Sequence, residues 1–134
     1  MISGKKFDEG KPKAKHLEIG RRGEDLALSF LKTKGYKPLI RNFRTRFGEI
    51  DLIVQDGQTI VFVEVKSRSS SAFGSAGEAV NHEKIRRLSR AAAAYLTEKE
   101  WPERPARFDI VEVDFSDSKP CLTHWPDALE LEIG

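Results

Sequence analysis

The chain has 134 residues, of which 39% are hydrophobic and 33% are charged, and its formal net charge is +2. These values are typical of one soluble globular domain, and no run approaches the roughly 20 apolar residues that a membrane-spanning helix needs. The single cysteine, Cys121, excludes an internal disulfide and a cysteine-rich zinc site, and it predicts a reducing, cytoplasmic location.

Lysine crowds the start of the chain. Residues 1–15 carry five lysines, two glycines and one proline without hydrophobic periodicity, and we interpret them as a flexible basic tail before a single domain over 16–134. Two more basic clusters occur at 41–46 and 84–90. Basic patches on a protein of near-zero net charge suit a polyanionic partner, although each cluster alone is also what an ordinary solvated surface carries.

A helical pattern spans residues 17–34, and Gly35 is its expected C-terminal stop. Glu24 precedes Ala27 and Leu31 at helical spacing, so the three side chains share one face of the helix. A carboxylate is therefore expected on or beside the apolar stripe that packs inward.

Short strands dominate the rest of the chain. Three are predicted at 36–44, 49–55 and 58–67, and the last two meet at Asp56-Gly57, a strong hairpin turn signal. The elements expected after them are a loop at 68–77, a helix at 78–99, a strand at 107–115 and a short edge strand at 121–125 that Pro126 ends.

This order of elements predicts an α/β fold with a mixed sheet flanked by helices. The first three strands can form an antiparallel meander. The second helix can then serve as a crossover that places the fourth strand parallel to the third. The third strand is apolar on both faces at its start, which is typical of a central strand covered on both sides.

Charged residues interrupt the otherwise apolar hairpin GEIDLIVQDGQTIVFVEVK at 48–66. Asp51 lies in its first strand, and Glu64 and Lys66 share one face of the second, because side chains alternate along a strand. The turn brings Asp51 to about the level of residues 62–64, in a strand roughly 4.8 Å away. Two neighbouring carboxylates repel each other unless a cation or a proton lies between them.

These charges predict a metal-dependent site for phosphodiester cleavage. Mg²⁺ prefers carboxylate oxygens, so Asp51 and Glu64 are the expected ligands, with Glu24 as a third carboxylate. Lys66 would orient or help to deprotonate a metal-bound water, whose pKa the metal lowers. The alternatives are a surface aspartate for Asp51, a cross-strand ion pair for Glu64 and Lys66, and a buried charge network that stabilises the fold.

The segments GEIDLI, VFVEVKSR and AVNHEKIRRLSRAAAAYL resemble the YraN-like family of small bacterial proteins, over about residues 18–125. That family is similar to the PD-(D/E)XK nuclease superfamily, and its fold resembles that of archaeal Holliday-junction resolvases. The resemblance implies a restriction-endonuclease-like αβββαβ core, in agreement with the order of elements above. Because the resolvase-like proteins are dimers, it also makes a homodimer an option for this chain.

The resemblance also implies roles for individual residues. Asp51 and Glu64 match the metal-binding carboxylates of the superfamily, and Lys66 matches its catalytic lysine. Glu24 matches an acidic residue on the first helix of the resolvase-like members. Val65 would lend its backbone carbonyl to the metal.

We therefore expect an endonuclease-like protein, dependent on Mg²⁺ or Mn²⁺, that binds and cleaves DNA, with branched or damaged DNA as the expected substrate. Basic side chains neutralise nucleic-acid phosphates. The candidate phosphate contacts are Arg44, Arg46, Arg68, Lys84 and Arg87. The alternatives are a nucleic-acid-binding module without chemistry and a structural or adaptor protein, because a nuclease fold alone does not establish cleavage.

Overall fold

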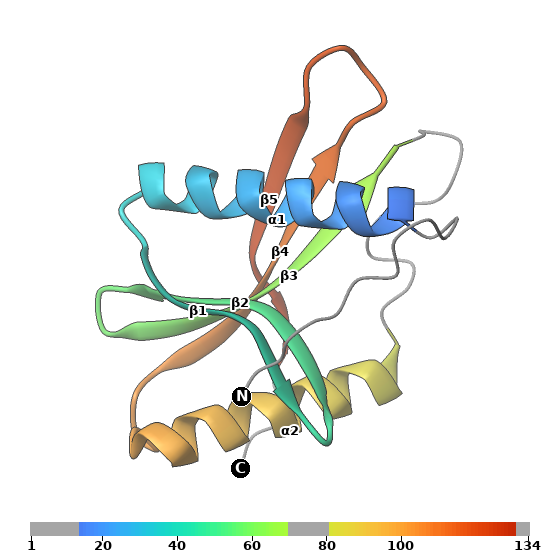
Figure 1. Cartoon of the computed structure of the whole chain (residues 1–134). Coiled ribbons are helices and arrows are strands. Elements are labelled where there is room, and N and C mark those ends of the chain that lie inside the picture. Colours follow the sequence, from blue (N-terminus) through green and yellow to red (C-terminus); the bar gives the residue numbers. More distant parts are fainter. Residues whose placement is uncertain (1–13, 70–80, 131–134) are drawn as a thin grey trace.

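The computed structural model describes residues 14–69 and 81–130, which form two helices and five strands (Figure 1). The helices are α1 (Ala14–Thr33) and α2 (His82–Lys99). The strands are β1 (Lys37–Thr45), β2 (Gly48–Asp56), β3 (Thr59–Arg68), β4 (Ala106–Asp114) and β5 (Cys121–Leu129). The predicted order of helix, three strands, helix, strand and edge strand is confirmed. Most of the predicted tail and most of the predicted loop at 68–77 lie outside the described residues.

The five strands form one sheet in the order β1-β2-β3-β4-β5. β3 and β4 are parallel, and the other neighbouring pairs are antiparallel. The first three strands are therefore the predicted meander, and α2 is the predicted crossover between β3 and β4. This mixed sheet is consistent with a restriction-endonuclease-like core.

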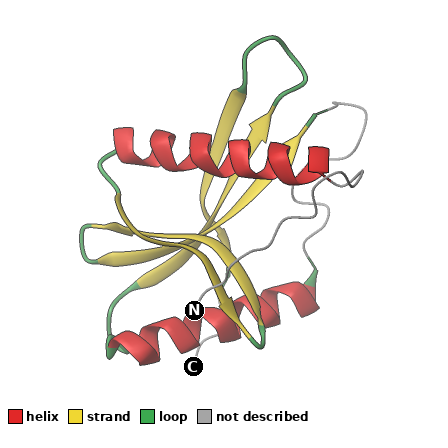
Figure 2. Cartoon of the chain, in the orientation of Figure 1, coloured by secondary structure: helices red, strands yellow, loops and turns green. Residues whose placement is uncertain are grey.

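The sheet lies between the two helices, which cover its opposite faces (Figure 2). β3 contributes alternate residues to the two resulting cores. Phe62 belongs to the core that includes Tyr95 of α2, and Val63 belongs to the core that includes Leu31 of α1. All four side chains are buried, so the prediction of a central strand covered on both sides is confirmed.

The helix ends follow local sequence signals. Gly35 has a φ of 90° and its N–H donates to Lys32 O at 2.9 Å, so it ends α1 as predicted. α2 begins at His82, because Asn81 has an extended backbone and caps the helix with its side chain; the start expected at residue 78 lies outside the described residues. Within the described part of the chain, neither helix is long and apolar enough to cross a membrane.

The edge strand β5 corrects one prediction. It does not end before Pro126 but continues through it to Leu129. A bulge makes this path feasible, because β5 residues 126–128 lie opposite Asp109 alone in β4. Within the bulge, Asp127 has a φ of 54° and its N–H donates to Asp109 Oδ1 at 2.8 Å. A proline is tolerated at such a position because an edge bulge needs no ladder hydrogen bond from it.

Candidate active site

β2 and β3 pair side by side from their connecting turn only as far as Leu52 and Val63. Beyond this pair β3 continues along β4 and β2 continues along β1, and Figure 1 shows β2 bending toward α2 as the strands part. The N–H of Val65 donates at this fork to Asp51 Oδ2, at 2.8 Å, in place of a β2 carbonyl. The level expected for Asp51, beside residues 62–64, agrees with this register.

Asp51 also marks a change of face within β2. Ile50 belongs to the α2-side core and Leu52 to the α1-side core, although two residues so spaced share one face in a regular strand. In β1, Asn42 lies between the partners of these two residues and has a φ of 52°, in the left-handed region that asparagine tolerates. This local irregularity turns the Asp51 carboxylate toward the backbone of β3.

Glu64 lies on the other side of the fork, with only 7% of its surface exposed. Its Oε2 is 3.5 Å from Lys66 Nζ and 2.8 Å from Lys84 Nζ, so two ammonium groups adjoin one carboxylate oxygen. Lys84 reaches the site from the first turn of α2, which Asn81 caps. Burial opposes the charge on Lys84, but the hydrogen bond to Glu64 and the charges of Glu64 and Asp51 outweigh it and raise the pKa of Lys84.

Glu24 approaches the same region from α1, with 17% of its side chain exposed. Its Oε1 lies 3.4 Å from Arg41 Nη2 and 3.4 Å from Asn42 Nδ2. The same Asn42 amide donates to Glu49 Oε2 at 3.0 Å. Asn42 therefore lies between two carboxylates, and Glu24 is the inward-facing glutamate that helical periodicity predicted.

The carboxylates influence one another. Burial raises the pKa of Asp51 well above its usual range, and the negative charge of Glu64 raises it further. The Val65 N–H acts in the opposite direction, while the charges of Glu24 and Glu49 add to the increase. Burial likewise raises the pKa of Glu24. A cluster of this kind, desolvated and rich in like charge, is typical of a functional site.

The donor atoms suit a hard divalent cation. Asp51 and Glu64 offer carboxylate oxygens. The Val65 N–H points toward β2, where it contacts Asp51, and the carbonyl of the same residue points to the same side of the strand. Within residues 14–69 and 81–130, however, no three His, Cys, Asp or Glu side chains are already gathered as a ligand set. Since Lys66 and Lys84 both contact Glu64 Oε2, a metal ion that binds this oxygen would have to displace ammonium groups from it.

Basic side chains gather around the β1–β2 turn. The guanidinium groups of Arg46 and Arg90 lie 5.2 and 5.6 Å from the centre of the Phe47 ring. Arg87 lies beside Gly48 of the same turn, since a Cβ built on that glycine would be 3.9 Å from Arg87 Cβ. We call Arg46, Arg87 and Arg90 the turn surface; all three are exposed.

The other two candidate arginines have carboxylate partners. Arg44 Nε lies 3.5 Å from Glu49 Oε1, and 59% of its side chain is exposed. Arg68 Nη1 lies 3.0 Å from Glu112 Oε2, and only 20% of its side chain is exposed. Arg44 is therefore open to a polyanion beside the turn surface, whereas Arg68 is mostly buried at the end of the central strand β3, where Glu112 binds it.

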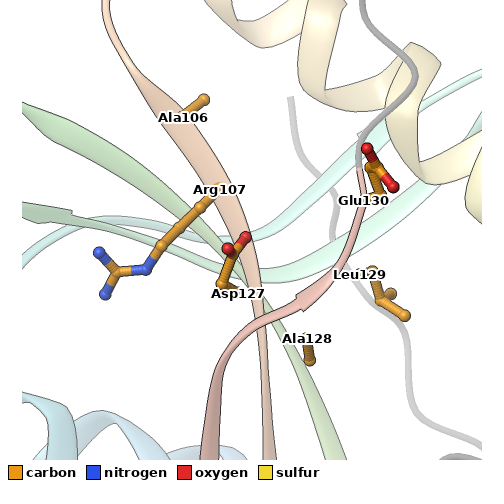
Figure 3. A pocket seen from close by; sticks show the side chains of 6 residues that line it. All are labelled: Ala106, Arg107, Asp127, Ala128, Leu129 and Glu130. Atoms are coloured by element: carbon orange, nitrogen blue, oxygen red, sulfur yellow. The ribbon is translucent and has the colours of Figure 1, made fainter.

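A concavity of about 640 Å³ lies elsewhere, where β4 begins and β5 ends (Figure 3). It is lined by Ala106, Arg107, Asp127, Ala128, Leu129 and Glu130. The Arg107 guanidinium is already bound by Asp109 and Asp56, at 3.0 and 3.2 Å. The carboxylates and lysines of the fork do not line this concavity, so we place no chemistry in it.

Sequence reasoning missed three features of the fork. It treated Lys84 as an outer phosphate contact and gave no role to Asn42 or Glu49. Asn81, a preferred N-cap residue, could have placed Lys84 in the first turn of the crossover helix, near the end of β3. Asn42 had no comparable signal, because its part depends on the pairing of β1 with β2.

The described residues thus define a small α/β protein with carboxylates and two lysines gathered where two strands part. A family model described as "Uncharacterised protein family UPF0102" matches residues 23–113, which include every candidate site residue. The chain belongs to the UPF0102 family, and the resemblance to YraN-like proteins is confirmed.

Two curated relatives illustrate the match. A UPF0102 protein of Geobacter metallireducens is 45% identical over 113 residues, which cover 84% of this chain and 93% of the relative. A UPF0102 protein of Syntrophomonas wolfei is 48% identical over 109 residues, which cover 80% and 93%. The similarity therefore extends over nearly the whole of each relative.

Proposed function

We propose that this chain is a cytoplasmic, divalent-metal-dependent endonuclease-like protein that binds and cleaves DNA. The observation that carries the proposal is the fork, where Asp51 and Glu64 share one buried region with Lys66. The order of these residues in the chain, an aspartate strand followed by Glu-x-Lys, agrees with the PD-(D/E)XK pattern, except that Ile50 stands where the pattern has proline. Apolar packing would serve a purely structural sheet better than partly compensated buried charge.

Each group of the fork has a chemical part in this proposal. Asp51, Glu64 and the Val65 carbonyl would hold Mg²⁺ or Mn²⁺, with Glu24 as a further carboxylate nearby. The bound ion supplies a water of lowered pKa and offsets the charge of the phosphodiester. Lys66 Nζ lies 3.5 Å from Glu64 Oε2 and could orient the attacking water or exchange a proton with it.

The turn surface and Arg44 support a polyanionic substrate. Their guanidinium groups are exposed, and they lie at the β1–β2 turn, a few residues before Asp51 in β2. Phosphate contacts of this kind supply most of the affinity of proteins for nucleic acid without reading its sequence. The resemblance to resolvases extends the proposal to branched or damaged DNA and to a homodimer, which sedimentation of the purified protein measures.

A cleavage assay tests the proposal. Purified protein is incubated with labelled single-stranded, duplex, flapped and four-way-junction DNA, in Mg²⁺ or Mn²⁺ and in chelator. Lys66→Ala is run beside Lys119→Ala, which alters an exposed lysine in the β4–β5 connection. We expect metal-dependent cleavage by the wild type and the control, and a loss of about 100-fold or more in Lys66→Ala. Equal cleavage by both variants, or none by any protein, would contradict the proposal.

The second candidate is a nucleic-acid-binding module without chemistry. It is favoured by the two lysines at Glu64, since their ion pairs satisfy that carboxylate without a metal. Under this reading the wild type shifts DNA in a gel but cuts none of the substrates. Lys66→Ala then changes the affinity no more than Lys119→Ala does.

A further inference from the structure

Lys84 is the group whose position the cleavage proposal leaves unexplained. Its ammonium makes the shorter contact with Glu64, at 2.8 Å against 3.5 Å for Lys66. It comes from α2 and is distant in sequence from the hairpin that holds the acids. With 31% of its side chain exposed, the ammonium group has Glu64 on one side and access to solvent on the other.

The formal charges of the fork explain what a second lysine achieves. Asp51 and Glu64 carry two negative charges, and Lys66 and Lys84 carry two positive charges, so the four groups cancel. A divalent cation bound to the same carboxylates would leave these four groups and the ion with an excess of two positive charges. The lysine ammonium groups would then lose their attraction to Glu64 and gain an attraction to any phosphate beside the metal.

The place of Lys84 in its helix favours such an anion. Its backbone N–H is in the first turn of α2 and donates to the Asn81 cap at 2.9 Å. The N-terminal end of a helix carries a partial positive charge, which attracts phosphate groups. Lys84 therefore lies between the Glu64 carboxylate, which suits a metal ion, and the N-terminal end of α2, which suits a phosphate group.

We propose that Lys84 is an exchangeable internal cation, which neutralises Glu64 in the metal-free protein and moves to a substrate phosphate when a divalent cation binds. This inference rests on the proposed metal site at the fork. It assigns to Lys84 a metal-dependent role in substrate binding: metal and lysine compete for Oε2 of Glu64, and the released lysine binds DNA only when the metal is present.

Metal affinity tests the competition directly. Calorimetry with Mn²⁺ compares the wild type with Lys84→Met, which keeps the length of the side chain without its charge. Lys99→Met is the matched control, because Lys99 lies at the far end of the same helix, over the Tyr95 ring. We expect Lys84→Met to bind Mn²⁺ about fivefold more tightly, since the metal no longer displaces an ion pair, and Lys99→Met to match the wild type.

DNA affinity tests the transfer of the lysine. Binding of a four-way-junction oligonucleotide is measured against salt, in EDTA and in Ca²⁺, which binds the same kind of oxygen ligands as Mg²⁺. We expect Lys84→Met to weaken binding in Ca²⁺, with a salt slope smaller by about 0.9, and to leave binding in EDTA unchanged. Lys84→Arg keeps the charge, and it should restore both the affinity in Ca²⁺ and the wild-type Mn²⁺ affinity.

Each possible result has one meaning. An equal loss of DNA affinity in EDTA and in Ca²⁺ would make Lys84 an ordinary phosphate contact and overturn the inference. Unchanged or weaker Mn²⁺ binding by Lys84→Met, with Mn²⁺ binding by the wild type lost in Asp51→Asn, would also overturn it and leave the metal site standing. Absence of Mn²⁺ binding by the wild type would overturn the proposed function and the inference together.

Discussion

Two aspartates in neighbouring parts of the sheet, the buried Asp109 and the partly buried Asp51, differ in how their charge is compensated. Asp109 of β4 is 0% exposed, and it accepts hydrogen bonds from Arg107 Nε at 3.0 Å, His124 Nε2 at 2.8 Å and Asp127 N at 2.8 Å. Asp51 of β2 has one such donor within the described residues, the Val65 N–H. Burial raises the pKa of Asp51, and the negative charge of Glu64 raises it further.

The surroundings of Asp109 are those of a structural network. Lys34 Nζ lies 2.8 Å from His124 Nδ1, so Nδ1 accepts a hydrogen bond. The ring hydrogen is therefore assigned to Nε2, which donates it to Asp109. Arg107 also donates to Asp56 and to the Tyr36 hydroxyl. The network thus connects the α1–β1 connection, which holds Lys34 and Tyr36, with β2, β4 and β5. The contrast teaches that burial of a carboxylate alone does not point to function. A carboxylate with one backbone donor and a carboxylate neighbour, as at Asp51, is more typical of a functional site than one with the donors of Asp109.

Replacement of Asp109 is expected to have the largest effect on stability. Asp109→Ala leaves Arg107 and the 2%-exposed His124 without their shared buried partner. Removing one member of a buried ion pair costs about 3–5 kcal/mol of the free energy of unfolding, measured by denaturant titration. Asp109→Asn keeps an oxygen for the Asp127 N–H and should lose less. A loss below about 1 kcal/mol for Asp109→Ala would remove the contrast with Asp51.

Asp51→Asn is expected to behave in the opposite way in metal-free protein. It keeps an oxygen for the Val65 N–H but removes a charge that Glu64 repels. The free energy of unfolding in chelator should stay level or rise by about 1 kcal/mol. A decrease of about 2 kcal/mol or more would place Asp51 in a structural network like that of Asp109, and would favour the reading in which these charges stabilise the fold.

The raised pKa of Asp51 makes the stability of the folded protein depend on pH. The pKa of Asp51 in the folded protein is raised above its ordinary value of 3.8, so the folded state binds the proton more tightly than the unfolded state. This contribution to stability is present at low pH and is lost as the pH rises from about 4 through the raised value. In chelator, the melting temperature of Asp51→Asn should therefore exceed that of the wild type, by a difference that grows as the pH rises toward 7. A constant difference would contradict the assignment.

The sequence predicted the part of this arrangement that depends on nearby residues. Gly35 and the Asp56-Gly57 turn mark their element ends, and hairpin geometry places Asp51 opposite the Glu64 strand. The ending of β5 was predicted wrongly, because the bulge after Pro126 depends on a hydrogen bond to Asp109 in another strand.

The remaining features depend on contacts between distant segments. Lys84 reaches Glu64 only because the crossover helix starts near the end of β3, and Asn42 joins Glu24 to Glu49 only after β1 pairs with β2. No local periodicity carries that information. Patterns of spacing therefore predicted that Asp51 lies near the Glu64 strand and that Lys66 lies beside Glu64, but not that Lys84 and Asn42 contact the carboxylates of the fork.

The smallest predicted effect concerns how closely α1 approaches the fork. Gly23 precedes Glu24 in α1, and a Cβ at this position would overlap Ser67 Oγ and lie 3.2 Å from Ser67 Cβ. Gly20, one turn earlier in the helix, has no atom within 4 Å of the corresponding position. The two glycines therefore form a matched pair, one against β3 and one in open space.

Alanine in place of glycine raises helix stability by about 0.5–1 kcal/mol where nothing interferes. We expect this full gain for Gly20→Ala and little or no gain for Gly23→Ala, because Ser67 must move away. In a Ser67→Ala background, Gly23→Ala should regain several tenths of a kcal/mol, a coupling that a double-mutant cycle of unfolding free energies measures. Equal gains at both glycines would mean that Ser67 does not hold α1 against β3 at Gly23.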